Sequence, residues 1–144
     1  MLSVRIRRLR PSVTLPRYQT GGAAGFDLEA SEDVTVAPDT VALVPTGLVI
    51  RVPDGYFLGI FARSSTPLKR GLIVSNGVGV IDSDYCGASD EIKIQVLNVT
   101  RAPVTVKTGD RIAQGLFIPV ARAEWQETHE DLRTGSRGGF GATG

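Results

Sequence analysis

The sequence predicts a single domain built almost entirely from β-strands. Seventeen glycines and eight prolines punctuate its 144 residues, and short runs rich in β-branched residues lie between them. No stretch keeps a 3.6-residue apolar period over three turns, which argues against long amphipathic helices. Many short strands joined by tight turns are typical of a β-sandwich, a barrel or a jelly roll.

The strands can be placed one after another along the chain. Near the N-terminus, Arg5 and Arg7 alternate with Val4 and Ile6, so we expect a strand with a solvated basic face rather than a nucleic-acid patch. Turn-forming residues at 37–39, 53–55 and 107–110 mark joints between later strands. These later strands are expected at residues 34–36, 41–44, 48–52, 56–61, 92–97, 104–106 and 112–118.

One short helix is expected in the middle of the chain. Thr66 suits its N-cap, and Pro67 suits the first helical position, where a missing N–H costs nothing. Lys69 and Arg70 would lie in the last turn, where cations complement the helix dipole. Gly71 would then end the helix.

The composition excludes several classes of function. The net charge is +1, so no overall field directs the protein to nucleic acid or to a membrane. A single cysteine, Cys86, and a single histidine, His129, allow neither an intrachain disulfide nor a zinc site of usual spacing. The sequence shows no apolar run of signal-peptide or membrane-span length. We therefore expect a soluble, cytoplasmic protein without nucleic-acid or membrane partners.

The end of the chain differs from the rest. Residues 134–144 contain five glycines and one aromatic side chain, Phe140, and cannot form a core of their own. Such a segment is either a disordered end or a flap, in which Arg137 would bring charge and Phe140 would stack on a base. The sequence thus predicts a domain over residues 1–133 and a flexible tail over residues 134–144.

The residues before the expected helix can bind an anion. Arg63, Ser64 and Ser65 supply a forked cation and two hydroxyls next to free backbone N–H groups. Helix capping alone would also explain the hydroxyls, so the residues leave both interpretations open.

Residues 76–87 resemble two strands of a hairpin around an acidic turn. Asp82 and Asp84 either form the turn or border a pocket, in which Gly77 and Gly79 would let a planar ligand approach the backbone. Two further stretches, GFDLE and GDRIAQ, each look like a turn that leads into a strand.

Taken together, these stretches resemble the five ordered motifs of the trimeric dUTP diphosphatase family. The order and the spacing extend over nearly the whole chain. The motifs are AGFDLEA at 24–30, ARSSTPLKRG at 62–71, the stretch 76–87 centred on IDSDY, GDRIAQ at 109–114 and GGFGATG at 138–144.

The resemblance implies a fold, a reaction and an assembly. The fold is a distorted jelly roll or β-clip barrel with one short helix, assembled as a homotrimer with active sites at subunit contacts. The reaction is hydrolysis of dUTP to dUMP and pyrophosphate with Mg²⁺, and the tail of one subunit closes a site that other subunits form. No direct protein ligand to the metal is expected.

The resemblance also implies roles for individual residues. Asp82 matches the carboxylate that activates the attacking water, and Tyr85 matches the ring under the deoxyribose. Asp27 matches an acidic residue that reaches the metal through water. The remaining substrate contacts match Asn76, Val80, Ile81 and Lys93 near the base and sugar, Arg63, Ser64, Ser65, Gln114 and Arg137 on phosphates, Phe140 on uracil and Thr143 on the γ-phosphate.

Three departures from the family pattern affect these assignments. The family's tail arginine falls at Gly135, so Arg137 or Arg133 would replace it, with Arg137 preferred. Ala142 lacks a hydroxyl that the family has. Residues 88–90 (Ala-Ser-Asp) look inserted, which affects the expected contact of Lys93.

Two other functions compete with this one. A dCTP deaminase, or a bifunctional deaminase and diphosphatase, has the same fold but carries a catalytic Glu on the strand after the hairpin, and residues 92–98 hold none. A non-catalytic β-sandwich module is the other candidate. Asp82, Arg63 and the tail aromatic argue against it.

Overall fold

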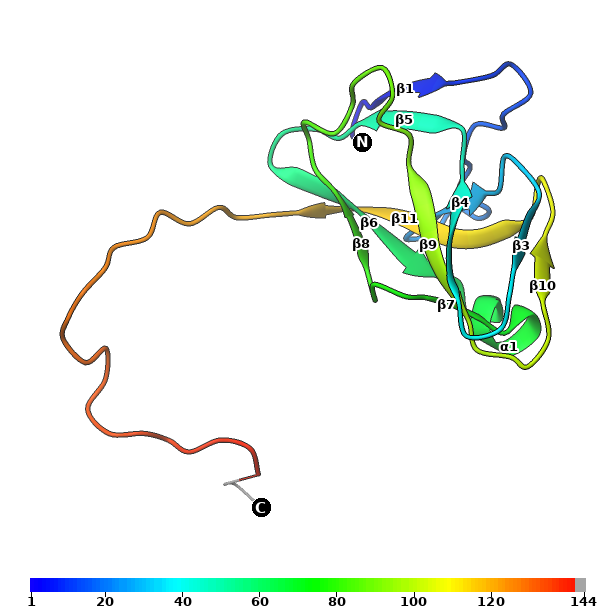
Figure 1. Ribbon diagram of the computed structural model, residues 1–144. Helices are drawn as coiled ribbons and strands as arrows, with labels where there is room; N and C mark the ends of the chain where they lie inside the picture. The colour runs from blue at the N-terminus through cyan, green and yellow to red at the C-terminus, as the bar shows by residue number, and fades with distance from the viewer. Residues whose placement is uncertain (142–144) are drawn as a thin grey trace.

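The computed structural model describes residues 1–141 and confirms an all-β domain with one short helix in that part of the chain (Figure 1). The strands are short because glycines and prolines interrupt the backbone every few residues. The elements are β1 (Arg5–Arg8), β2 (Phe26–Glu29), β3 (Val34–Val36), β4 (Val41–Pro45), β5 (Leu48–Arg51), β6 (Tyr56–Ala62), α1 (Ser65–Arg70), β7 (Leu72–Val74), β8 (Gly79–Ile81), β9 (Lys93–Asn98), β10 (Val104–Val106) and β11 (Arg111–Pro119).

The strands form a jelly roll in which neighbours in a sheet are distant in sequence. The largest sheet has the order β2-β11-β6-β8, and a second sheet has the order β4-β9-β7. Two-stranded ladders of β1 with β5 and of β3 with β10 complete the described domain. Every pair is antiparallel. This order brings β8 to the edge of its sheet, where one side of its backbone has no strand partner.

The core lies between the two larger sheets. Along β9, Ile94 and Val96 are fully buried while Lys93 is exposed, because successive side chains of a strand point to opposite faces. The other fully buried apolar side chains include Leu28, Val44, Leu58, Leu72, Val106 and Ile112.

The helix confirms the expected end but corrects the expected start. Gly71 adopts φ 64°, a left-handed conformation, and ends the helix as predicted. Ser64, rather than Thr66, holds the N-cap position, and it makes no side-chain capping bond. The hydroxyl of Thr66 is buried and instead donates to the carbonyl oxygen of Ile112 at 2.8 Å, so it anchors the helix to β11.

The hairpin expected over residues 76–87 forms only in part. Residues 79–81 make the strand β8, but residues 82–92 are turns and irregular backbone instead of a second strand. The short strand β7 was not predicted. The other predicted strands agree with the observed ones to within one or two residues.

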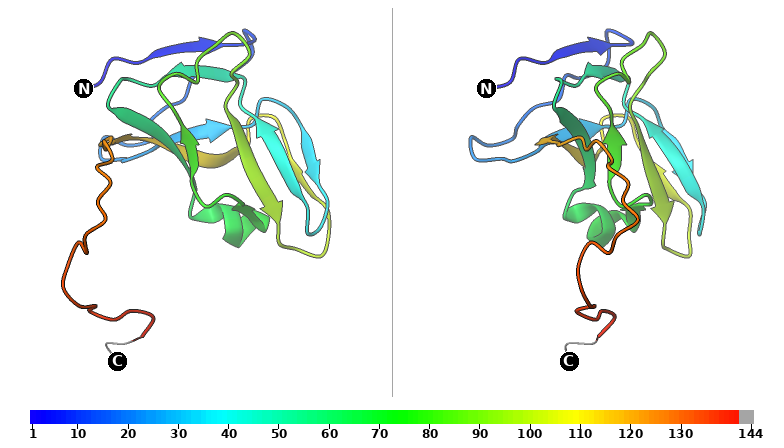
Figure 2. Two further views of the ribbon diagram at one scale, coloured as in Figure 1. Left: turned by 60° about the vertical axis from the view of Figure 1, so that its left-hand side comes forward. Right: turned by 90° about the vertical axis from the view of Figure 1, so that its left-hand side faces the viewer.

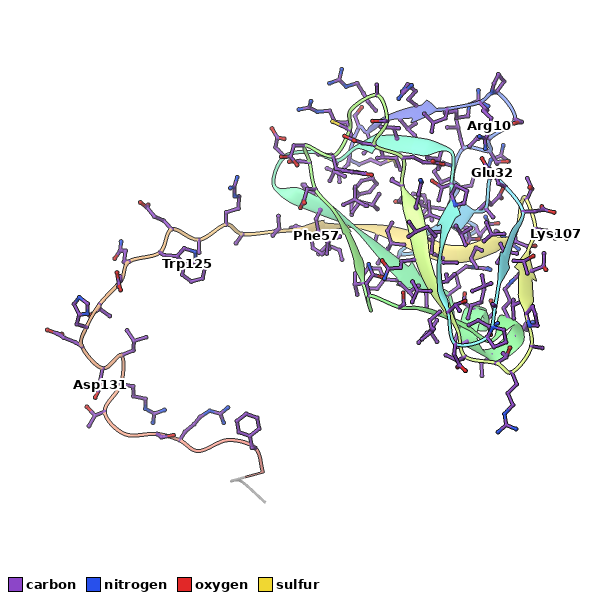
Figure 3. The ribbon with its side chains drawn as sticks, viewed as in Figure 1. Arg10, Glu32, Phe57, Lys107, Trp125 and Asp131 are labelled. Carbon is purple, nitrogen blue, oxygen red and sulfur yellow. The ribbon has the colours of Figure 1, made fainter. Side chains whose placement is uncertain are left out.

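The chain leaves the domain after β11. Residues 120–141, the C-terminal arm, are exposed throughout, and the arm extends away from the sheets in Figure 1 and in the left-hand view of Figure 2. The side chain of Trp125 is 90% exposed on this arm (Figure 3). No helix in the described residues has the length and apolarity to span a membrane.

Candidate active site

The first cluster of candidate residues lies where β6 runs into α1. The Nε of Arg63 is 2.7 Å from one carboxylate oxygen of Asp27, and a guanidinium nitrogen of Arg63 donates to the carbonyl oxygen of Arg111 at 3.0 Å. The second carboxylate oxygen of Asp27 lies 3.1 Å from Arg111. With its side chain only 10% exposed, Asp27 therefore holds two guanidinium groups in place.

The other residues of this cluster come from neighbouring elements. Gln114 on β11 donates to the carbonyl oxygen of Ala62 at 3.1 Å, which fixes its amide beside the end of β6. Gly25 packs so closely that a Cβ there would lie 2.9 Å from the Gln114 side-chain oxygen. Ser64 and Ser65 begin the helix, and Ser64 is exposed. The arrangement presents two hydroxyls, one amide and a fixed cation to a bound anion.

An ion pair ties the end of the helix to the turn before β11. Arg70 donates to the carboxylate of Asp110 at 2.6 Å, and this hydrogen bond lowers the pKa of the Asp110 carboxyl. The same carboxylate accepts the backbone N–H of Lys107 at 2.8 Å. Helix and turn are thus joined next to the first cluster, which we call the anion cluster, since Arg111 follows Asp110.

The second cluster lies along β8 and the turn that follows it. Val80 is 58% exposed on this edge strand, and Asp82 follows the strand with its side chain exposed. Asn76 is exposed in the turn before the strand, where Gly77 takes φ 74°. Because β8 pairs with β6 alone within residues 1–141, backbone N–H and C=O groups on its other side are available to a ligand.

A cavity of about 420 Å³ borders this cluster. Lys93 lies on its wall, so residues 88–90, which look inserted relative to the family pattern, do not remove that side chain from the neighbourhood of Asp82. Sequence reasoning did not identify Leu43, Ser89 or Glu91 as neighbours of a ligand, because they lie outside the motifs. The full lining is Leu43, Val80, Ile81, Asp82, Tyr85, Ser89, Glu91 and Lys93.

The two clusters stand apart in one copy of the chain. Ile81 pairs with Leu58 on β6, whereas Arg63 follows the far end of the same strand. Five residues of extended chain separate Leu58 from Arg63 by roughly 16 Å. Asp82 and Arg63 of one chain are therefore too far apart to act on the same phosphate.

The tail candidates lie on the C-terminal arm, away from both clusters. Arg133, Arg137 and Phe140 are exposed, and Phe140 adopts φ 49°, with positive φ also at Gly138 and Gly141. Thr143 lies outside the described residues.

The fold and the two clusters fit a nucleotide-binding protein, a jelly-roll subunit with an anion cluster and a cavity of base size. The dUTPase family model matches residues 12–144. The chain belongs to the dUTPase family.

Individual relatives agree with this membership. The deoxyuridine 5'-triphosphate nucleotidohydrolase of Anaeromyxobacter sp. (strain Fw109-5) is 45% identical over 99% of this chain and 98% of its own length. That of Desulfitobacterium hafniense (strain Y51) is 48% identical over 90% of this chain and 87% of its own.

Solved structures show the same architecture. The crystal structure of the dUTPase from Streptococcus mutans is 35% identical, with a TM-score of 0.76 over 83% of this chain and 98% of that one. The dUTPase of Staphylococcus bacteriophage 80alpha with dUPNHPP has a TM-score of 0.87 at 22% identity, covering 100% of this chain and 99% of that one. This second likeness concerns the fold alone.

Proposed function

We propose that this protein hydrolyses dUTP to dUMP and pyrophosphate, which keeps uracil out of DNA and supplies dUMP for dTMP synthesis. The observation that carries the proposal is the position of Asp82, an exposed carboxylate on the wall of a cavity that Tyr85 and the free edge of β8 also line. Relatives that match nearly the whole chain are named for this reaction.

The chemistry assigned to Asp82 is general base catalysis. Its carboxylate polarises a water molecule, the water oxygen attacks the α-phosphorus, and Asp82 accepts the proton that is released. The bond from the α-phosphorus to the bridging oxygen breaks, and pyrophosphate leaves with the electron pair. In-line attack of this kind requires positioning and charge neutralisation more than covalent chemistry.

Neutralisation of the phosphate charge is assigned to the first cluster and to the tail. Arg63 is held by Asp27, and its guanidinium keeps a terminal nitrogen for a phosphate, while Ser64, Ser65 and Gln114 add hydrogen-bond donors. Arg137 of the tail, in preference to Arg133, would complete the set, with Thr143 on the γ-phosphate.

Magnesium is assigned to the phosphates of the substrate rather than to a cage of protein ligands. The ion prefers carboxylate and phosphate oxygens and keeps several of its waters. No direct protein ligand is proposed, and because both oxygens of Asp27 already face arginines, its contact with the ion would run through water. When bound through the substrate phosphates, Mg²⁺ would neutralise their charge.

Base and sugar selectivity are assigned to β8 and Tyr85. Uracil presents an N3–H donor and an O4 acceptor, and cytosine reverses both. The backbone at Val80 and Ile81 cannot exchange donor for acceptor, so it would reject cytosine, with Asn76 assisting. The ring of Tyr85 would leave no room for a ribose 2′-hydroxyl, and Phe140 of the tail would cover the uracil.

A homotrimer with shared sites explains three features of one chain. The anion cluster and Asp82 of one chain are too far apart to bind the same phosphate. The C-terminal arm, residues 120–141, is exposed throughout and does not pack on its own domain. In addition, Val41, Leu97 and Ile73 are cross-strand partners that form an apolar row on the outer face of β4, β9 and β7, with Val41 56% exposed. An exposed row of this kind is suited to a contact between copies. We place the assembly in the cytoplasm.

Pyrophosphate release from dUTP by the purified protein with Mg²⁺ tests the function. Substitution Asp82→Asn should lower kcat by ~10²–10⁴-fold, because the amide cannot accept the proton. It should leave binding of a non-hydrolysable dUTP analogue nearly unchanged. Substitution Asp84→Asn, two residues further along the same turn, is the matched control and should retain most activity. Release of ammonia from dCTP would instead identify the deaminase.

A further inference from the structure

A closed turn follows Tyr85 and was not assigned any role by the motifs. The carboxylate of Asp90 accepts the backbone N–H of Gly87 at 2.7 Å, and the N–H of Asp90 donates to the carbonyl oxygen of Gly87 at 3.3 Å. The two residues thus bind each other at both ends of the inserted segment. Residues 87–90 therefore form a closed turn, and the strand β9 begins shortly after it at Lys93.

Two further elements hold this turn from outside. The guanidinium of Arg7 on β1 donates to the carbonyl oxygen of Ala88. The carboxylate of Glu91 accepts the N–H of Gly47, between β4 and β5, at 2.8 Å. The segment Gly87–Glu91 is consequently tied to two parts of the domain that are distant in sequence.

The turn in turn holds the candidate sugar-stacking ring. The phenol hydroxyl of Tyr85 donates to the carbonyl oxygen of Glu91 at 3.2 Å, and the N–H of Glu91 donates to Ser89 at 2.9 Å. The Tyr85 side chain is 41% exposed and faces the cavity that Asp82 borders. The far end of the ring is thus fixed by the segment that Asp90 closes.

We propose that the Gly87–Glu91 turn, closed by Asp90, is a specificity-determining support that fixes the Tyr85 ring and so excludes a ribose 2′-hydroxyl. This inference rests on the proposed function, in which the ring lies under the deoxyribose. A ring rejects an extra hydroxyl only while it cannot move, and a group left loose by about 1 Å no longer discriminates. Asp90 is therefore a positioning residue that acts through Tyr85.

The experiment compares deoxyribose with ribose ligands by two independent readouts. The first is kcat/KM for dUTP and for UTP with Mg²⁺. The second is calorimetric Kd for the α,β-imido analogue of dUTP and for its ribose counterpart, which needs no turnover. In Asp90→Ala, the preference for the deoxyribose ligand should fall by about tenfold in both readouts, mostly through a gain in binding of the ribose ligand.

Three further variants separate positioning from general stability. Asp90→Asn keeps an oxygen that can accept the Gly87 N–H and should restore the preference. Tyr85→Phe loses only the hydroxyl and should relax the preference as Asp90→Ala does. Asp33→Ala is the matched control, because Asp33 accepts the N–H of Thr108 at 2.8 Å in another surface turn. It should leave the preference unchanged.

The outcomes distinguish this inference from the proposed function. Unchanged ratios of Kd in Asp90→Ala or in Tyr85→Phe would overturn the inference, as would equal Kd values for the two analogues in the natural protein. Selective binding of the dUTP analogue without pyrophosphate release would refute the hydrolysis, and the binding ratios would still decide the role of Asp90.

Discussion

A single carboxylate, that of Asp27, organises the first cluster through the guanidinium groups that it binds. Asp27 binds two guanidinium groups, and with a side chain only 10% exposed it is shielded from the screening that weakens surface pairs. By contrast, Arg10 and Glu32 pair at 2.9 Å with both side chains about half exposed, at the surface visible in Figure 3. The shielded pair of Asp27 with Arg63 orients an arginine that is a candidate to bind phosphate, whereas the exposed pair of Arg10 with Glu32 adds little stability.

The carboxyl group of Asp33, which binds the turn before β11 from outside, should make stability depend on pH. Hydrogen bonds from the backbone N–H of Thr108 and from Lys107 lower the pKa of Asp33 from 3.8 to about 2. Because the folded state holds this proton less tightly than the unfolded state, the group stabilises the fold above pH 3.8. That contribution disappears as the pH falls through about 2.

The comparison of Asp33→Asn with the natural protein checks this expectation. Thermal unfolding at constant ionic strength should give a higher Tm for the natural protein at neutral pH. The difference in Tm should stay constant down to pH 3.8 and then shrink toward zero near pH 2. A difference that persists unchanged at the lowest pH would show that the ionised carboxylate is not its source.

At the scale of elements, the end of α1 depends on one glycine. Gly71 has φ 64°, and a Cβ there would lie 2.0 Å from the methyl carbon of Thr100. Gly71→Ala should therefore lower the free energy of unfolding by about 2 kcal/mol or more, since the left-handed conformation alone costs about 1–2 kcal/mol. Chemical denaturation at a fixed protein concentration measures the loss.

Two controls separate backbone strain from the clash at that helix end. Gly109→Ala has φ 86° with no atom within 4 Å of the new Cβ, so it should cost only the backbone term. The pair Gly71→Ala with Thr100→Ser removes the methyl group while it keeps the hydroxyl that donates to Asn98. The double variant should recover the part of the unfolding free energy that the clash removes. Equal losses of unfolding free energy in all three variants would contradict a clash with Thr100.

The elements that sequence could predict are those that their own residues determine. Runs such as Val104–Val106 alternate inward and outward with glycine or proline nearby, and they form strands as expected. The start of α1 was predicted wrongly because the Thr66 hydroxyl bonds to Ile112, a partner 46 residues away that no local pattern reveals. The expected second strand after Asp82 does not form, because the N–H groups of Tyr85 and Cys86 bind back to the carbonyl oxygens of Asp82 and Asp84 in tight turns.

The same division holds for the candidate site. The family motifs located the residues of both clusters, because these motifs are continuous in sequence. They did not locate Leu43, whose exposed position on β4 resembles that of any outward-facing strand residue. They did not locate Glu91 either, because it lies between the motifs, and its carboxylate accepts the N–H of Gly47. The roles of individual residues in catalysis stay predictions.

At the scale of the whole molecule, the two clusters of one chain lie toward opposite ends of β6. Asp82 follows β8 and lies near the start of β6, whereas Arg63 follows the end of β6. The two side chains of one chain therefore stay apart as long as the sheet keeps its shape. The apolar row on β4, β9 and β7 is the surface that we propose for contact between copies. We therefore predict that activity requires assembly.

Mixing two inactive variants tests whether the two clusters combine across different copies. Asp82→Asn and Arg63→Ala should each be inactive alone, because every site lacks one of the two groups. In assemblies refolded from an equal mixture, a site takes Asp82 from an Arg63→Ala copy and Arg63 from an Asp82→Asn copy in about one quarter of cases. Pyrophosphate release from dUTP should therefore recover to about a quarter of the natural rate. A mixture of Asp82→Asn with Asp82→Ala, prepared in the same way, should recover nothing. If both groups of a site came from one chain, neither mixture would regain activity, and the division of the site between copies would be wrong.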